Sequence, residues 1–206
     1  MKRAVFVFVL GFVVSSCAQS ECDFLIRVND EQIIIVGYTG TAKDIVIPES
    51  IQGMPIVIIG HAAFSEKNLV NVTIPDSVIH IGEKAFINNR LTVLTIPSGI
   101  TRIGNYAFSE NNLIKLTIPN SVTHIGEYAF ANNRLTDLII PSGVTEIWKK
   151  AFSDNRLTSV IIPDSVRYIG ADAFAGNQLT SVTIPKSLRC IGGGVFDPNV
   201  SITRSP

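Results

Sequence analysis

The chain has 206 residues, of which 46% are hydrophobic and 17% charged, with 17 Lys and Arg residues balanced by 17 Asp and Glu residues. This length accommodates either one domain with a sizeable core or one continuous repeat array. The charges are scattered and show no basic excess, so they give no electrostatic argument for a nucleic-acid partner.

The first residues have the layout of a secretory signal. Lys2 and Arg3 give a positive start, residues 4–14 are mostly apolar, and small residues follow. This apolar segment is far shorter than the roughly 20 residues that span a bilayer, and no other segment approaches that length. The sequence therefore predicts an exported protein with a signal peptide at residues 1–16 and no spanning helix in the mature chain.

The cleavage region allows two interpretations. Residues 14–17 resemble a bacterial lipobox, in which Cys17 becomes the lipidated N-terminal residue and residues 17–22 form an anchor and linker. Alternatively, residues 16–18 form an ordinary signal-peptidase site that is cut before Gln19. Because acyl chains contribute ~0.8 kcal/mol per buried CH₂, lipidation of Cys17 holds the protein at a membrane face without a helix.

Two apolar segments then flank residues 29–31, which predicts a β-hairpin. Residues 44–60 keep the Ile-Pro and Ile-Gly dipeptides of the later repeats but space them five residues wider. The first coil of a repeat solenoid otherwise exposes its core and a strand edge. We therefore expect residues 23–60 to form an N-terminal hairpin cap and a first variant coil.

Residues 61–192 are six copies of a 22-residue unit. Phenylalanines recur at the same step, at positions 64, 86, 108, 130, 152, 174 and 196. A period of this length is the signature of a repeat solenoid. One unit cannot bury its own apolar face, whereas stacked units share one core and extend a parallel sheet at ~4.8 Å per coil.

Each part of the unit has a structural interpretation, illustrated by residues 105–126. The motif LxxLxIP predicts a short strand, which Pro119 closes because proline has no backbone N–H. The next segment is expected to bury Val122 and Ile125 on the opposite wall, and the glycine after it to turn the chain. The Asn that follows the Phe suits a tight turn, since its amide bonds neighbouring backbone and it tolerates a positive φ.

The motif LxxLxIPxSVxxIGxxAFxxN closely resembles the treponemal-type, BspA-like leucine-rich repeats of bacterial surface proteins, over about residues 45–196. The resemblance implies a mainly β, right-handed leucine-rich-repeat solenoid and an exported or cell-surface location. It also implies adhesion to host matrix proteins, host cells or other bacteria. The shared motif is structural, so it identifies neither a ligand nor catalytic residues.

The outward positions of the LxxLxIP strand supply candidate partner-binding residues. One column includes Val93, Lys115 and Asp137, and a second is a threonine ladder interrupted by Ile139 and Ile161. Threonine suits an exposed strand. The adjacent isoleucines either belong to a contact patch or are ordinary surface apolar residues.

Trp148 stands where the neighbouring repeats carry glycine, as in Gly126 and Gly170. It either anchors a partner, as aromatic residues do in interface hot spots, or packs over a neighbouring coil. The same wall carries His80 and His124 two coils apart, roughly 10 Å, which is too far for one metal ion. We therefore expect no metal site.

Cys22 and Cys190 flank almost the whole array, roughly 25–30 Å apart, and cannot form a disulfide within one molecule. Cys17 and Cys22 can pair if Cys17 survives cleavage without lipid.

Residues 193–206 keep Phe196 in register and then form a partial repeat and tail, for which we expect either fraying or self-association. No catalytic, phosphate-loop or dinucleotide motif is present, which predicts a protein that is not an enzyme and takes no cofactor.

Together these features predict an exported leucine-rich-repeat protein that binds host matrix or other cell-surface proteins as an adhesin-like module. The alternative is a periplasm-facing envelope lipoprotein with a structural or assembly role. In either case we expect protein partners, and membrane contact through the N-terminal lipid only.

Overall fold

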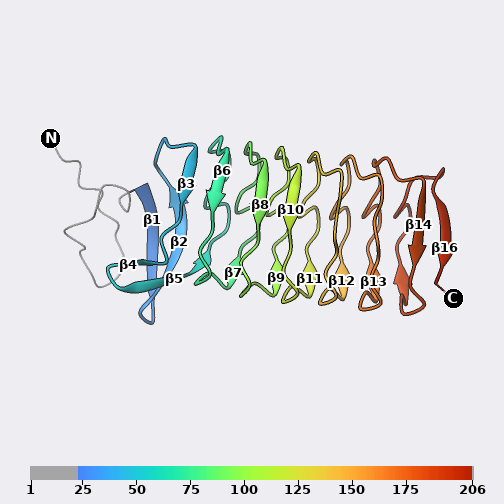
Figure 1. Cartoon of the computed structure of the whole chain (residues 1–206). Helices are drawn as coiled ribbons and strands as arrows, with labels where there is room; N and C mark the ends of the chain where they lie inside the picture. Colours follow the sequence, from blue (N-terminus) through green and yellow to red (C-terminus); the bar gives the residue numbers. More distant parts are fainter. Residues whose placement is uncertain (1–22, 206) are drawn as a thin grey trace.

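The computed structural model describes residues 23–205, which form one solenoid without an α-helix (Figure 1). Successive coils stack along a single axis, and two rows of strands follow that axis on different walls. The coils repeat every 22 residues and their strands pair in parallel. The structure thus confirms the predicted mainly β solenoid.

The longer row of strands forms a ten-stranded sheet. It begins with β1 (Phe24–Asn29), β2 (Gln32–Tyr38) and β5 (Met54–Ile59), to which β4 (Ser50–Ile51) is paired, and continues in the order β7-β9-β11-β12-β13-β15. Its coil strands have two residues each and pair in register, so each residue lies beside the one 22 positions further on. These strands are β7 (His80–Ile81), β9 (Arg102–Ile103), β11 (His124–Ile125), β12 (Glu146–Ile147), β13 (Tyr168–Ile169) and β15 (Cys190–Ile191).

The LxxLxIP segments form the second row, which is divided into separate parallel pairs. The pairs are β3 (Asp44–Val46) with β6 (Asn71–Thr73), β8 (Val93–Thr95) with β10 (Lys115–Thr117), and β14 (Ser181–Ile184) with β16 (Ser201–Arg204). Between β10 and β14, an isolated bridge joins Ile139 to Ile161.

The continuous ladder therefore lies on the wall opposite the LxxLxIP strands. Each LxxLxIP strand runs into a proline, such as Pro119, which has no N–H to donate to the ladder. On the opposite wall, the two-residue strands of the repeats contain no proline, and their coils donate backbone N–H groups regularly to the preceding coil. One example is the N–H of Gly126, which donates to the carbonyl of Ile103 at 3.0 Å.

A column of stacked phenylalanine rings fills the centre of the coils. From Phe64 to Phe196 the ring centroids are 4.9–5.6 Å apart and the interplanar angles are 4–14°. The rings from Phe64 to Phe174 are fully buried, and Phe196 is 7% exposed. Burial of each ring stabilises the fold by roughly 1.5–3 kcal/mol.

A second buried column, of asparagines, joins each coil to the one before it. The Nδ2 of Asn133 donates to the carbonyls of Phe108, Phe130 and Ala131 at 3.0, 3.1 and 3.2 Å, and its Oδ1 accepts from the N–H of Leu113 at 3.0 Å. Two of these partners belong to the previous coil, so the side chain fixes the two coils together while satisfying buried backbone groups. The column comprises the buried Asn89, Asn111, Asn133 and Asn155 and the half-buried Asn177.

The positive φ expected at these asparagines occurs one residue earlier. Asn132, at φ 55°, precedes Asn133, and Glu110, at φ 55°, precedes Asn111. The expected bonding to neighbouring backbone is confirmed, and the same side chain also bonds the previous coil.

The predicted hairpin forms from β1 (Phe24–Asn29) and β2 (Gln32–Tyr38), which are antiparallel. Asp30 and Glu31 form its turn at φ 46° and 59°. This two-residue connection, with both φ angles positive, suits the right-handed twist of the two strands.

The hairpin covers the start of the solenoid. β2 continues into the coils by pairing in parallel with β5 (Met54–Ile59), against which β4 (Ser50–Ile51) lies antiparallel. The rings of Phe24 and Tyr38 lie 6.2 and 5.6 Å from that of Phe64, so aromatic packing closes the end of the phenylalanine column.

The C-terminal segment is a strand, and the expectation of a frayed tail is wrong for residues up to 205. β16 pairs with β14 and places Ser201 beside Ser181, so the last coil has 20 residues where the regular repeats have 22. The Asp197 carboxylate accepts hydrogen bonds from the N–H groups of Gly176 and Asn177, which fastens the shorter coil.

The expected signal peptide, the linker, Cys17 and Cys22 lie outside the described residues. Within residues 23–205, no helix has the length and apolar character that crossing a membrane requires.

Replacing Asn133 by alanine should lower the free energy of unfolding by about 2–4 kcal/mol, because buried backbone groups of two coils lose their partners. The change should appear as a lower urea midpoint for the mature chain in far-UV circular dichroism. The matched control is Asn112→Ala, since half-buried Asn112 bonds the previous coil through its backbone N–H. Equal midpoints for the two variants would show that the asparagine column does not hold the coils together.

Candidate functional site

The outward face of the LxxLxIP wall carries the predicted apolar pair. Ile139 and Ile161 are 84% and 82% exposed and lie beside each other on adjacent coils. The neighbouring Ile140 and Ile162 are 5% exposed and supply the core contacts of those coils. Core packing therefore does not require isoleucine at positions 139 and 161, where other coils carry threonine.

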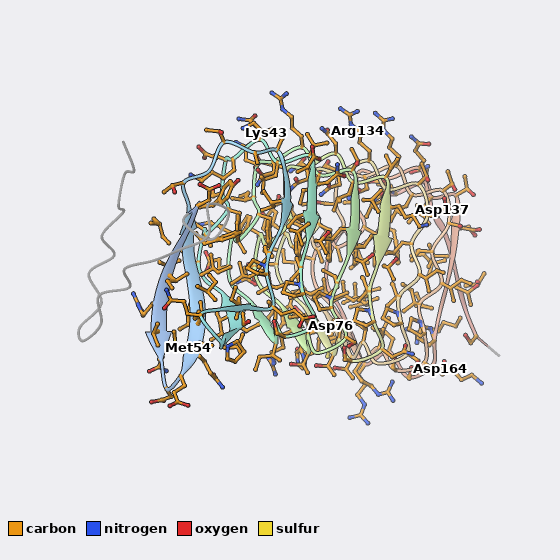
Figure 2. The ribbon with its side chains drawn as sticks, turned by 60° about the vertical axis from the view of Figure 1, so that its left-hand side comes forward. Lys43, Met54, Asp76, Arg134, Asp137 and Asp164 are labelled. Carbon is orange, nitrogen blue, oxygen red and sulfur yellow. The ribbon has the colours of Figure 1, made fainter. Side chains whose placement is uncertain are left out.

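The other predicted residues of this wall lie in the adjacent column. Val93 is 45% exposed and pairs in register with Lys115, and Asp137 occupies the equivalent position of the next coil. The Asp137 carboxylate accepts a hydrogen bond from the Thr136 hydroxyl at 2.9 Å. This part of the wall thus combines an apolar pair with the charges of Lys115 and Asp137. Arg134 lies at one margin of the solenoid and Asp164 at the opposite one (Figure 2).

A column of lysines and tyrosines was missed by the sequence interpretation. The rings of Tyr106 and Tyr128 stack at 4.6 Å and 8°. The Nζ of Lys84 lies 5.5 Å from the Tyr106 ring and that of Lys150 lies 5.6 Å from the Tyr128 ring. Exposed cation–π contacts stabilise by about 0.5–1 kcal/mol each. The available signal was the 22-residue spacing of these four residues, each directly before an Ala-Phe pair.

Close contact with the previous coil, and not an unusual φ, favours glycine at most corners. A Cβ on Gly126 would lie 2.7 Å from the carbonyl oxygen of Ile103 in the previous coil. The positive φ of the corner belongs to Tyr128, at 54°, two residues later. The expectation that this glycine turns the chain through its conformational freedom is therefore wrong.

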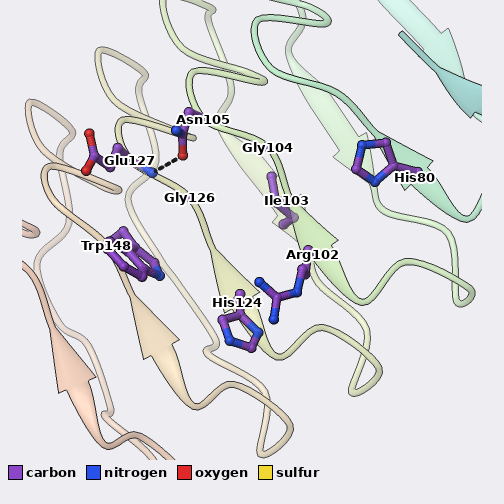
Figure 3. A pocket seen from close by; sticks show the side chains of 9 residues that line it. All are labelled: His80, Arg102, Ile103, Gly104, Asn105, His124, Gly126, Glu127 and Trp148. Atoms are coloured by element: carbon purple, nitrogen blue, oxygen red, sulfur yellow. Dashed lines mark hydrogen bonds between the residues drawn. The ribbon is translucent and has the colours of Figure 1, made fainter. Parts of the chain in front are cut away.

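These glycines leave a shallow groove that runs along the solenoid (Figure 3). Gly104, which is half-buried, and Gly126, which is buried, lie between its two sides. The sides carry polar residues, with Arg102 and His124 on the strand side and Asn105 and Glu127 on the corner side. The Oδ1 of Asn105 accepts from the N–H of Glu127 at 2.9 Å, which joins the two coils on the corner side.

Trp148 closes one end of this groove because its side chain occupies a glycine position. Its backbone N–H still donates to the carbonyl of Ile125 at 2.9 Å, so the ladder is preserved. The ring lies 5.3 Å from that of Tyr168 in the next coil, tilted by 54°. The expected packing over a neighbouring coil is confirmed. The indole remains 39% exposed, and its role as an anchor for a partner remains a prediction.

Glu146 connects Trp148 to His124. Its Oε2 accepts from the indole Nε1 at 3.1 Å and lies 3.4 Å from the Nε2 of His124. The Nδ1 of His124 lies 2.7 Å from the hydroxyl of Thr123. These contacts hold the indole in one orientation beside the groove.

Among residues 23–205, no group of three or more His, Cys, Asp or Glu side chains could hold a metal ion. His80 and His124 both line the groove, but Arg102 stands between them in the column. The Cys190 thiol is free and exposed near the C-terminal end of the ten-stranded sheet.

The stacked 22-residue coils, with their phenylalanine column and parallel ladder, define a leucine-rich-repeat solenoid. A family model described as "BspA type Leucine rich repeat region" matches residues 38–158 and 145–205, with six copies. The chain belongs to this family. Its members share a repeat that is suited to presenting a binding surface.

Comparison with solved structures supports the same fold. A leucine-rich cell surface protein from Faecalibacterium prausnitzii is 23% identical, with a TM-score of 0.58 over 93% of this chain and 77% of that one. A leucine-rich repeat protein from Bacteroides ovatus is 20% identical, with a TM-score of 0.53 over 95% of this chain and 67% of that one. At these identities the likeness shows the fold alone. No curated protein matches the chain in sequence.

Replacing Gly126 by alanine should lower the free energy of unfolding by about 1–3 kcal/mol, because the added methyl group pushes neighbouring coils apart. Gly193→Ala is the matched control, since a Cβ there meets no atom within 4 Å among the described residues. Urea unfolding of both variants measures the difference. Equal stabilities would mean that close approach of the coils does not select glycine at the corner.

Proposed function

We propose that this chain is exported and binds other proteins through the wall that carries Ile139 and Ile161, acting as an adhesin-like module at the cell surface. The expected partners are host matrix proteins or proteins on the surfaces of other cells. Lipidation of Cys17 supplies the anchor to the membrane. Binding, and not catalysis, is proposed because the chain offers shaped surfaces and no catalytic motif.

The exposure of Ile139 and Ile161 is the observation that carries this proposal. Adjacent isoleucines that are more than four-fifths exposed present apolar surface that water solvates poorly, and burial against a partner recovers that free energy at about 25 cal/mol per Å². Lys115 and Asp137 beside them supply charges that orient a partner and exclude mismatched ones.

The location rests on two further observations. Residues 1–17 have the layout of an export signal that ends in a cysteine. The similar Faecalibacterium prausnitzii protein is described as a cell surface protein, and the chain shares its fold. Both observations support export. We also propose that the protein acts on the outer side of the envelope.

The double variant Ile139→Thr, Ile161→Thr should bind immobilised extracellular matrix or whole partner cells at least about tenfold more weakly than the unchanged mature chain. Threonine is the residue that most other coils carry there, so the fold should be unaffected. The matched control is Ile79→Thr, since Ile79 is 56% exposed directly before β7 of the ten-stranded sheet. Equal losses in the two proteins would contradict the assignment of the binding wall.

Protease treatment of intact cells tests the location. The native protein should be cleaved and should carry an acyl label. The Cys17→Ala variant should be released from the cells. A labelled protein that is protected until the envelope is broken would overturn the surface assignment. That outcome would favour the periplasm-facing envelope lipoprotein.

A further inference from the structure

We propose that the groove beside Trp148 binds an extended acidic segment of a partner protein in the polyproline II conformation. Arg102 pairs with a carboxylate of that segment, and Trp148 contacts an apolar residue three positions further along it. This inference rests on the proposal that the chain binds proteins, but it assigns a second site on a different wall from Ile139 and Ile161.

Two unused donors flank Gly104 and define where the carboxylate binds. Within residues 23–205, the guanidinium of exposed Arg102 has no hydrogen-bond or ion-pair partner. Asn105 uses its Oδ1 to accept from the N–H of Glu127, which leaves its Nδ2 as a donor. Arg102 stands on the strand side of the groove and Asn105 on the corner side (Figure 3). A planar guanidinium fork matches a carboxylate with two parallel hydrogen bonds.

Among the residues that line the groove, Arg102 carries the positive charge and Glu127, one coil further along, carries the negative one, so an anionic group is favoured on the Gly104 side. His80 and His124 stand one coil to either side of Arg102 in the same column, so hydrogen-bond donors dominate the strand side. The carboxylate of Glu146 is already engaged by the Trp148 indole and lies beside His124. The side chain of Glu127 can accept an N–H of the bound segment one coil further along.

The distance between the two anchors selects the conformation of the ligand. Arg102 and Trp148 belong to coils two steps apart, which is ~10 Å at the spacing of parallel strands. A polyproline II helix has three residues per turn and rises 3.1 Å per residue, so residues i and i+3 face the same side about 9.3 Å apart. In a β-strand those residues point to opposite faces. The groove therefore fits an acidic residue followed, after two others, by an apolar one.

Trp148 is already oriented for such a contact. Its indole is 39% exposed and is held by Glu146 and by the ring of Tyr168, so binding does not require it to change rotamer. A preorganised aromatic side chain loses little conformational entropy on binding. Aromatic residues that line a groove are also the usual recognition element for polyproline II segments.

The test uses the full mature chain and a fluorescein-labelled polyproline peptide that contains one Glu and a Phe three positions after it. Fluorescence anisotropy at low salt should show saturable binding. Arg102→Gln and Trp148→Gly should each weaken it about tenfold, and the peptide with Gln in place of Glu should lose a similar factor. Arg134→Gln is the matched control, because Arg134 is an exposed arginine that does not line the groove.

Several outcomes would overturn the inference. They are the absence of saturable binding to the unchanged chain, equal weakening by Arg134→Gln, and undiminished binding of a peptide whose Phe lies two positions after the Glu. Binding of free glucuronate at Arg102 without binding of the peptide would identify an acidic-sugar site instead. The double variant at Ile139 and Ile161 should bind the peptide normally, so the experiments can refute either proposed site without refuting the other.

Discussion

The buried asparagine column fixes the separation and the register of the coils, and the other regular features depend on it. Each asparagine bonds backbone groups of its own coil and of the previous one, so a coil displaced along the axis or by one residue would leave several buried polar groups without partners. The stacked phenylalanine rings and the in-register ladder require the same separation. Where the coils approach closely, as at Gly126, a single added carbon atom would crowd the neighbouring backbone.

This register turns each position of the repeat into a column on the surface. A column with one residue type is uniform, so recognition has to come from the coils that depart from the pattern. Ile139 and Ile161 replace threonine in one column, and Trp148 replaces glycine in another. In the column directly before the Ala-Phe pairs, tyrosines follow a lysine. The departures at Ile139, Ile161 and Trp148 cluster in the middle and later coils, on two walls. A repeat protein of this kind can therefore change its partners by single substitutions that leave the core untouched.

The sequence was sufficient to predict the features that depend on side-chain period. These include the phenylalanine column, the hairpin cap and the outward orientation of Ile139 and Ile161. It did not indicate which wall carries the continuous ladder, because that depends on backbone donors. The role of Gly126 depends on a distance to Ile103 in another coil, which no local pattern contains. β16 was missed because its coil departs from the period, and the groove because it consists of glycine positions, where side chains are missing.

Removal of one whole coil tests most directly whether coil register governs this fold. Deleting residues 105–126 joins Gly104 to Glu127 and keeps every column aligned, whereas deleting residues 105–115 puts the two halves out of register. The account predicts that the first protein still unfolds cooperatively in urea, with a midpoint somewhat below that of the full chain, and that the second does not. Similar unfolding curves for the two deletions would contradict it.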